Sequence, residues 1–206
     1  MEDCRKKNFK KYDWLIFYDI DEFLFLRNFS NIKDFLNQKY FNKCQRIQLN
    51  WFMHTDNNLF NYDNRTLEER FPEKRIYNNG KYIDLSKAVK SILKGNIDVK
   101  ITGQHYLNPN LTGCNGFGQI KNLSNIQTKE PDHYYYYIDH YWSKSTEEFV
   151  NKINRGDVNQ GYKNDKYNMK RIYFYFLYND ITKKKIDYIE NKTKYNLTEY
   201  RLKIKN

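Results

Sequence analysis

The fold of this chain is decided by Asp13-Trp14-Leu15-Ile16-Phe17-Tyr18-Asp19-Ile20-Asp21-Glu22, an apolar and aromatic run that ends in an acidic cluster. The apolar run predicts a short buried strand. Asp19 and Asp21 then stand at the carboxyl end of that strand, where ligands bind in open α/β sheets. Residues i and i+2 of a strand lie on one face, so we expect both carboxylates to converge on one Mg²⁺ or Mn²⁺ ion.

Further strands and helices are predicted after this cluster. Residues 46–51 alternate like a half-buried strand, and the tyrosine-rich stretch 134–140 predicts another. Ser145 and Glu148 form a capping box, which predicts a helix that ends at Gly156. The remaining predictions are helices over 31–38, 86–93 and 180–191, a strand over 97–101 and a loop over 54–81. Alternating strands and helices favour an α/β fold with a mixed or mainly parallel sheet.

Length and composition set the class of protein. The 206 residues are divided here into a domain over residues 1–160 and a basic, tyrosine-rich helical extension over residues 161–206. An aromatic share of 18% argues against disorder. The net charge of +11 favours a partner that carries phosphates. The excess of Lys over Arg, with abundant Asn, Tyr and Ile, is also typical of an A/T-rich genome, which weakens that argument.

The cysteines and the lengths of the apolar runs indicate the cellular compartment of the protein. Cys4, Cys44 and Cys114 are odd in number and far apart. We therefore expect no disulfide framework, no zinc site and a reducing compartment. No apolar run approaches a membrane span, and the N-terminus has no apolar signal region. The expectation is a cytoplasmic protein without a transmembrane segment, whose basic surface allows peripheral contact with an anionic membrane.

Two functions are weighed against the acidic cluster, a phosphatase and a nucleic-acid-binding module. A haloacid-dehalogenase-like phosphatase would use Asp19 and Asp21, but it normally continues with a small residue and then Thr or Val, where this chain has Glu22 and Phe23. It also needs a later acidic pair, and no Asp-Asp occurs. A basic, aromatic-rich nucleic-acid-binding module could stack bases on the Tyr and Phe of residues 160–206. That alternative gives the acidic cluster no role, so we expect no nucleic-acid partner.

Longer motifs carry a family resemblance. Residues 14–24, with Asp19-Ile20-Asp21-Glu22-Phe23, resemble the D-x-D-E-F segment of glycosyltransferase family 92, a group similar to family 2 and also known as "domain of unknown function 23". The strongest match is residues 140–156, HYWSKSTEEFVNKINRG, which is similar to the group's H-Y-x-x-K-S-x-E-E-F-x-x-K-x-x-R-G signature. Shorter landmarks occur in order at 47–51, 69–71, 90–92 and 104–105. The resemblance covers residues 12–160.

The resemblance implies a GT-A-like (Rossmann-like) mixed sheet flanked by helices. It implies a glycosyltransferase of hexosyltransferase type, acting in polysaccharide biosynthesis. A sugar would pass from a nucleotide-sugar donor to a saccharide or glycoconjugate acceptor, with inversion. Asp19 and Asp21 would hold Mn²⁺ or Mg²⁺, and His140 would complete the metal shell. Only residues 1–18 precede Asp19, where a GT-A domain usually has a much longer segment, so the resemblance implies an N-terminally truncated domain with an incomplete donor site.

Other site residues are candidates within this resemblance, each with a structural alternative such as a helix cap, a core position or a solvated charge. The capped helix start attracts anions, and the donor phosphates are assigned to Lys144, Ser145, Lys152 and Arg155. Sugar or acceptor contacts are assigned to Glu22, Trp51, His105 and Trp142, with His105 also the reserve metal ligand. Glu22 is expected to orient the metal loop. The candidate bases for the acceptor hydroxyl are Asp56 and Asp84.

Overall fold

The computed structural model describes residues 2–78, 80–98, 111–121, 131–156 and 165–204. The contact pattern divides the chain into two units. Unit 1 comprises residues 1–52 and 84–140, and unit 2 comprises residues 53–83 and 141–206. This division differs from the predicted boundary between residues 160 and 161, because residues 53–83 and the segment from Tyr141 onward, which includes α4, belong with the C-terminal helices.

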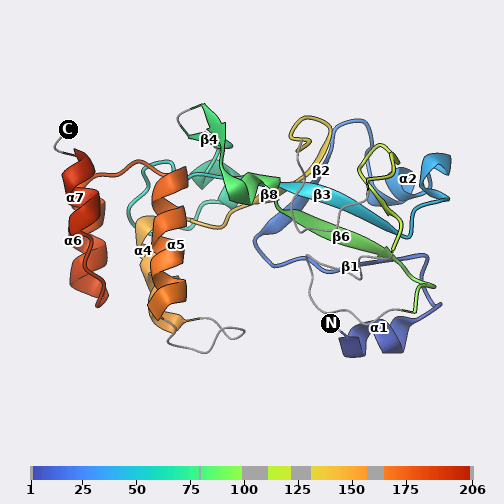
Figure 1. The fold of residues 1–206 in the computed structure, drawn as a ribbon, viewed down its shortest axis with the longest axis horizontal. Helices are drawn as coiled ribbons and strands as arrows, with labels where there is room; N and C mark the ends of the chain where they lie inside the picture. The colour runs from blue at the N-terminus through green and yellow to red at the C-terminus, as the bar shows by residue number, and fades with distance from the viewer. Residues whose placement is uncertain (1, 79, 99–110, 122–130, 157–164, 205–206) are drawn as a thin grey trace. The chain divides into compact units, whose positions relative to one another are not determined.

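Unit 1 is built on a six-stranded sheet, five strands of which follow the order β1-β6-β3-β8-β2 (Figure 1). The sixth strand, β7, pairs with the start of β3. The pairs β1–β6, β3–β6 and β2–β8 are antiparallel, whereas β3–β7 is parallel. The α/β class is therefore confirmed, with a mixed rather than a mainly parallel sheet. The strands are β1 (Trp14–Ile16), β2 (Glu22–Leu26), β3 (Arg46–Met53), β6 (Val89–Lys94), β7 (Gly113–Cys114) and β8 (Tyr136–His140).

Short helices accompany this sheet: α1 (Glu2–Asn8), α2 (Ile32–Leu36) and the 3₁₀ turns η1 (Lys39–Phe41) and η2 (Asp84–Lys87). The predicted helix over 86–93 is wrong, since Val89–Lys94 forms strand β6. That segment pairs with β1 on one side and β3 on the other, and these two ladders outweigh its local helical pattern. Ile97 and Asp98 lie outside any strand, and the rest of the predicted strand 97–101 falls outside the described residues.

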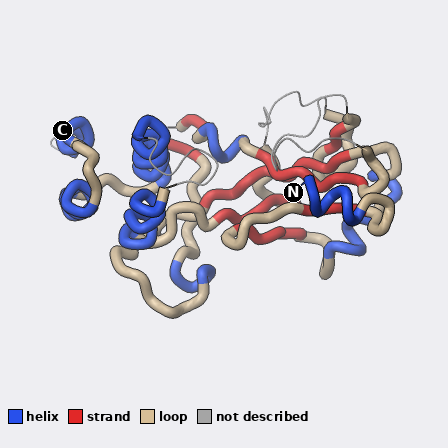
Figure 2. Tube along the Cα trace, turned by 90° about the horizontal axis from the view of Figure 1, so that it is seen from below, coloured by secondary structure: helices blue, strands red, loops and turns tan. Residues whose placement is uncertain are grey.

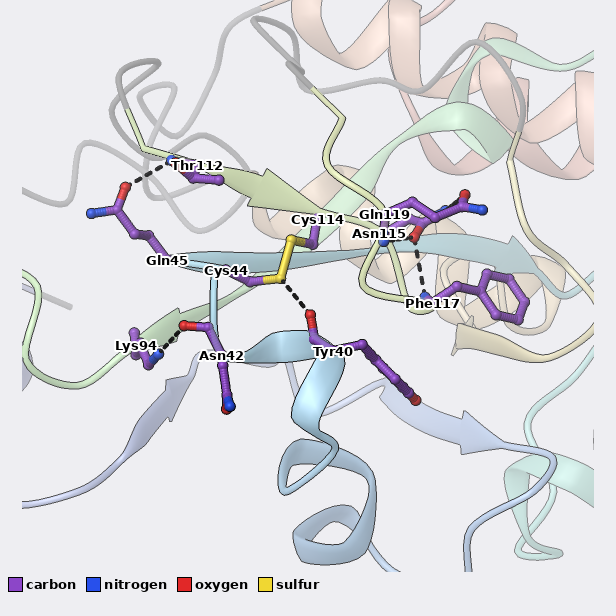
Figure 3. The surroundings of a disulfide bond; sticks show 10 residues. All are labelled: Tyr40, Asn42, Cys44, Gln45, Lys94, Thr112, Cys114, Asn115, Phe117 and Gln119. Carbon is purple, nitrogen blue, oxygen red and sulfur yellow. Dashed lines mark hydrogen bonds between the residues drawn. A yellow bond between two sulfur atoms is a disulfide. The ribbon is translucent and has the colours of Figure 1, made fainter.

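A disulfide links Cys44 to Cys114 (Figure 3). It joins the segment before β3 to β7, and the backbone N–H of Thr112 also donates to Gln45 Oε1 at 2.8 Å between the same segments. The prediction of no disulfide is wrong, because strand pairing brings together two cysteines whose spacing carries no local signal. The expectation of a reducing compartment loses its basis, since structural disulfides persist in oxidising ones.

Unit 2 is mainly helical, with its helices drawn in blue in Figure 2. The elements are α3 (Leu67–Arg70), β4 (Tyr77–Asn78), β5 (Lys81–Tyr82), α4 (Thr146–Arg155), α5 (Asp165–Tyr178), α6 (Lys183–Lys192) and α7 (Thr198–Ile204). The core joins α4, α5 and α6 through Phe149, Tyr175 and Ile186, and the first two rings stack at 4.2 Å. The predicted helix after Ser145 is confirmed, including its capping box and its end at Gly156. Among the described helices, none has both the length and the apolar character needed to cross a bilayer.

Candidate active site

The acidic cluster forms a closed turn between β1 and β2. The backbone N–H of Glu22 donates to the Asp19 carbonyl at 3.1 Å, and the backbone N–H of Asp19 donates to Glu22 Oε2 at 3.0 Å. Strand β1 already ends at Ile16, so Asp19 and Asp21 lie in the turn and not on one strand face. The strand-face argument is therefore wrong, and the two carboxylates have different partners.

Lys90 lies beneath this turn. It belongs to β6, two residues before Ile92, which pairs with Ile16 at the end of β1. Its side chain is 0% exposed, and its Nζ lies 2.9 Å from Asp19 Oδ2 and 3.0 Å from Glu22 Oε2. A buried ammonium is costly unless it is paired and hydrogen-bonded, and the two carboxylates meet that need.

His140 approaches the turn from the neighbouring strand. It is the last residue of β8 and pairs with Glu22, the first residue of β2. Its Nε2 lies 3.8 Å from Asp21 Oδ1 and 4.0 Å from Glu22 Oε1, too far for a direct hydrogen bond. The ring of Trp51, on β3, lies 4.4 Å from the His140 ring. The antiparallel pairing thus brings Asp21, Glu22 and His140 together, with Trp51 against the histidine.

Burial dominates the electrostatics of Glu22. Loss of water raises the pKa of its carboxyl, while the charge of Lys90 and the hydrogen bonds from Asp19 and Lys90 act against that shift. Glu22 Oε1 is buried and has no hydrogen-bond partner among the described residues. The pKa of the Tyr18 hydroxyl is raised as well, mainly by desolvation on burial and further by the charge of Glu22. The side of the carboxylate that faces His140 is therefore a buried acceptor position.

This arrangement fits a divalent ion that is shared with a substrate. Within the described part of the chain, no three His, Cys, Asp or Glu side chains gather closely enough to hold a metal ion by themselves. Mg²⁺ commonly takes only one or two protein carboxylates and fills its shell with water and substrate phosphates. Asp21 and His140, with the buried Oε1 of Glu22 beside them, match that type of site, whereas Asp19 is turned to Lys90.

The phosphate candidates belong to unit 2. The Ser145 hydroxyl is buried and serves the capping box of α4 with Glu148. Lys152 donates to the Trp142 carbonyl at 3.2 Å, and its Nζ lies 5.1 Å from the centre of the Trp142 ring. Lys144 has a positive φ of 55°, and Arg155 is exposed at the last turn of α4. The site described above, in unit 1, contains none of these residues.

The candidate bases differ from each other. Asp56, in unit 2, is 1% exposed, lies 2.7 Å from Lys185 Nζ and accepts from Tyr175 Oη at 2.6 Å. It has the contacts of a structural carboxylate. Asp84 begins η2 in unit 1. His105 falls outside the described residues.

Lys90 is the site residue for which sequence reasoning gave no role. Lys90 stands in the landmark at residues 90–92, between the apolar residues Val89 and Ile92. A lysine at that position points to a buried charge only once the segment is known to be a strand. The landmark at residues 69–71 has a structural role as well, since Arg70 Nη1 lies 2.7 Å from Glu148 Oε2 in unit 2.

The family model described as glycosyltransferase family 92 matches residues 1–191. No curated protein matches the chain.

Proposed function

Because this chain belongs to glycosyltransferase family 92, we propose that it moves a sugar from a nucleotide-sugar donor to a saccharide or glycoconjugate acceptor with a divalent ion held beside Asp21. Membership of the family makes the protein a glycosyltransferase. The metal dependence, the hexosyl donor, an inverting course and a role in polysaccharide biosynthesis are parts of the proposal.

The observation that carries the metal site is the meeting of the Asp19–Glu22 turn with the end of β8. Asp21 Oδ1 lies 3.8 Å and Glu22 Oε1 lies 4.0 Å from His140 Nε2. Carboxylate oxygen suits both Mn²⁺ and Mg²⁺, and the imidazole nitrogen of His140 favours Mn²⁺ of the two. We assign Asp21 and His140 as the protein ligands of the ion. Asp19 would contact the ion only through a water molecule, because its carboxylate pairs with Lys90.

When bound, a divalent ion supplies charge neutralisation for a leaving nucleoside diphosphate. The chain's own residues provide the position. The pairing of Glu22 with His140 fixes the distance between the two sides of the site. The Trp51 ring packs on His140 and limits its rotation, and Trp51 is itself buried.

An inverting transfer also needs a base for the acceptor hydroxyl. Asp56 is already paired with Lys185 and hydrogen-bonded to Tyr175 in a buried network of unit 2, which gives it a structural role. Asp84 lies in the same unit as the acidic turn and is the remaining candidate. We therefore assign the base to Asp84 within this proposal.

The test is binding of UDP and GDP to the purified chain by calorimetry, with and without Mn²⁺. We expect binding that requires Mn²⁺ and that Asp21→Asn abolishes. Asp13→Asn is the matched control, because Asp13 is an exposed aspartate of the same unit just before β1. Binding that does not require Mn²⁺, or that survives in Asp21→Asn, would overturn the metal assignment. Hydrolysis of an aryl phosphate that Asp19→Asn abolishes would favour the phosphatase alternative.

A further inference from the structure

Lys90 is an unusual residue for a central strand. Strand β6 lies between β1 and β3, and the Lys90 side chain is 0% exposed. Its Nζ contacts one oxygen of Asp19 and one of Glu22 at 2.9 and 3.0 Å, and it lies 6.0 Å from the centre of the Trp51 ring. An apolar residue would fill the same volume without the cost of burying an ammonium. The lysine therefore needs an explanation beyond packing.

The charges around the turn give that explanation. Asp19, Asp21 and Glu22 supply three carboxylates when ionised, and Lys90 supplies one ammonium, so the group sums to minus two with His140 neutral. One divalent cation would then neutralise the group. Without the ammonium, three carboxylates would face one another within a single turn, and a cation would be held much more strongly.

The same contacts also divide the carboxylate oxygens into those that pair with Lys90 and those that lie near His140. Lys90 Nζ pairs with Asp19 Oδ2 and Glu22 Oε2, and the Asp19 backbone N–H also donates to Glu22 Oε2. Glu22 Oε1 is thereby turned toward His140 Nε2, beside Asp21 Oδ1. The position of Lys90 thus separates the oxygens used to build the turn from those that face the histidine.

We propose that Lys90 is a positioning residue that sets the charge of this carboxylate group to match one divalent ion and holds Glu22 Oε2, so that Glu22 Oε1 is left on the side of His140. This inference rests on the proposed function, because it concerns the same metal site. A purely structural Lys90 would stabilise the fold but would leave the affinity for the ion unchanged once the protein is folded.

The test compares Mn²⁺ binding to the wild-type chain, Lys90→Met and Lys90→Arg by calorimetry, without nucleotide. Lys90→Met removes the charge at similar length, and we expect Mn²⁺ affinity to rise about tenfold or more. Lys90→Arg keeps the charge and should stay close to wild type. Lys94→Met is the matched control, because Lys94 is on the same strand and donates to the Asn42 carbonyl at 3.0 Å.

Loss of Lys90 leaves Glu22 buried without its counter-charge, so Lys90→Met can fail to fold. The pair Glu22→Gln and Lys90→Met/Glu22→Gln then gives the same comparison without that buried charge. We expect Mn²⁺ to bind the double variant about tenfold more tightly than Glu22→Gln alone.

The outcomes separate the two proposals. If the wild type binds Mn²⁺ and removal of Lys90 changes its affinity no more than Lys94→Met does, the role of Lys90 is overturned and the metal site stands. If the folded wild type binds no Mn²⁺, the metal site itself is overturned and the role of Lys90 with it.

Discussion

Arg70 Nη1 lies 2.7 Å from Glu148 Oε2, and the two side chains are only 6% and 21% exposed. Glu148 Oε2 also accepts from the Ser145 hydroxyl at 2.9 Å and from the Ser145 backbone N–H at 3.2 Å. One carboxylate thus closes the cap of α4 and pairs with α3. The sequence motifs around Arg70 and Glu148, seventy-eight residues apart, meet at this point in unit 2.

Removal of Arg70 should destabilise the protein strongly. Arg70→Met leaves Glu148 without its buried partner, and we expect a loss of about 3 kcal/mol in the free energy of unfolding. Urea unfolding followed by circular dichroism measures it. Arg65→Met is the control, since the Arg65–Asp63 pair is exposed and should contribute little. Equal effects of the two substitutions would contradict the structural role given to Arg70.

The disulfide should contribute more to stability than any single ion pair. Cys44 and Cys114 are 70 residues apart, and closing a loop of that length stabilises the fold by up to about 4 kcal/mol in the chain-entropy description. We expect the double substitution Cys44→Ala/Cys114→Ala to lower the free energy of unfolding accordingly under non-reducing conditions. Cys4→Ala, at the exposed free cysteine, should leave it unchanged. An unchanged urea midpoint in the double variant would argue that the bond does not form.

Asp56 should prove structural rather than catalytic. Asp56→Ala removes the buried partner of Lys185 and of the Tyr175 hydroxyl, and we expect a loss of about 3 kcal/mol in the free energy of unfolding. Asp180→Ala is the control, because the Asp180 side chain is 56% exposed and its pair with Arg75 should contribute little. A variant at Asp56 that unfolds like wild type yet transfers no sugar would instead mark Asp56 as the base.

Acid should weaken unit 2 through Glu190. Hydrogen bonds from Arg201, then from the Leu197 backbone N–H, hold the pKa of the Glu190 carboxyl below its usual range. The folded state therefore binds fewer protons than the unfolded chain, whose Glu titrates near about 4.3. This stability is present above that pH and is lost as the pH falls through the lower folded pKa. Arg201→Met should lose less stability than wild type between pH 7 and pH 3 in urea unfolding, and an equal loss would contradict the assignment.

Local signals in the sequence predicted the elements that local interactions determine. The helix after Ser145 was predicted because its cap, its apolar face and Gly156 all lie within one short segment. The strand over 46–51 was likewise predicted from alternation, and the structure extends it to Met53. The order of strands in the sheet could not be predicted, since it depends on pairings such as Leu49 with Lys90 between distant segments.

The candidate site was predicted in part for the same reason. Asp21 and His140 were named from motifs, and the structure brings them to 3.8 Å. Lys90 was named only within the landmark at residues 90–92 and was given no role, because its segment was predicted as a helix. The burial of a charged side chain in a central strand can be inferred only when both neighbouring strands are known. The disulfide was missed because its geometry follows from the pairing of β7 with β3.

The chain passes between the two units after Phe52, Ile83 and His140, and this has a consequence for synthesis on the ribosome. Unit 1 has all its residues once His140 has emerged. Residues 53–83 emerge earlier but must wait for the C-terminal helices, since Arg70 needs Glu148 and Asp56 needs Lys185. Because a nascent chain emerges from its N-terminus, unit 1 is the first to be able to fold. Residues 53–83, between β3 and β6, stay without these partners until α4 and α6 have emerged.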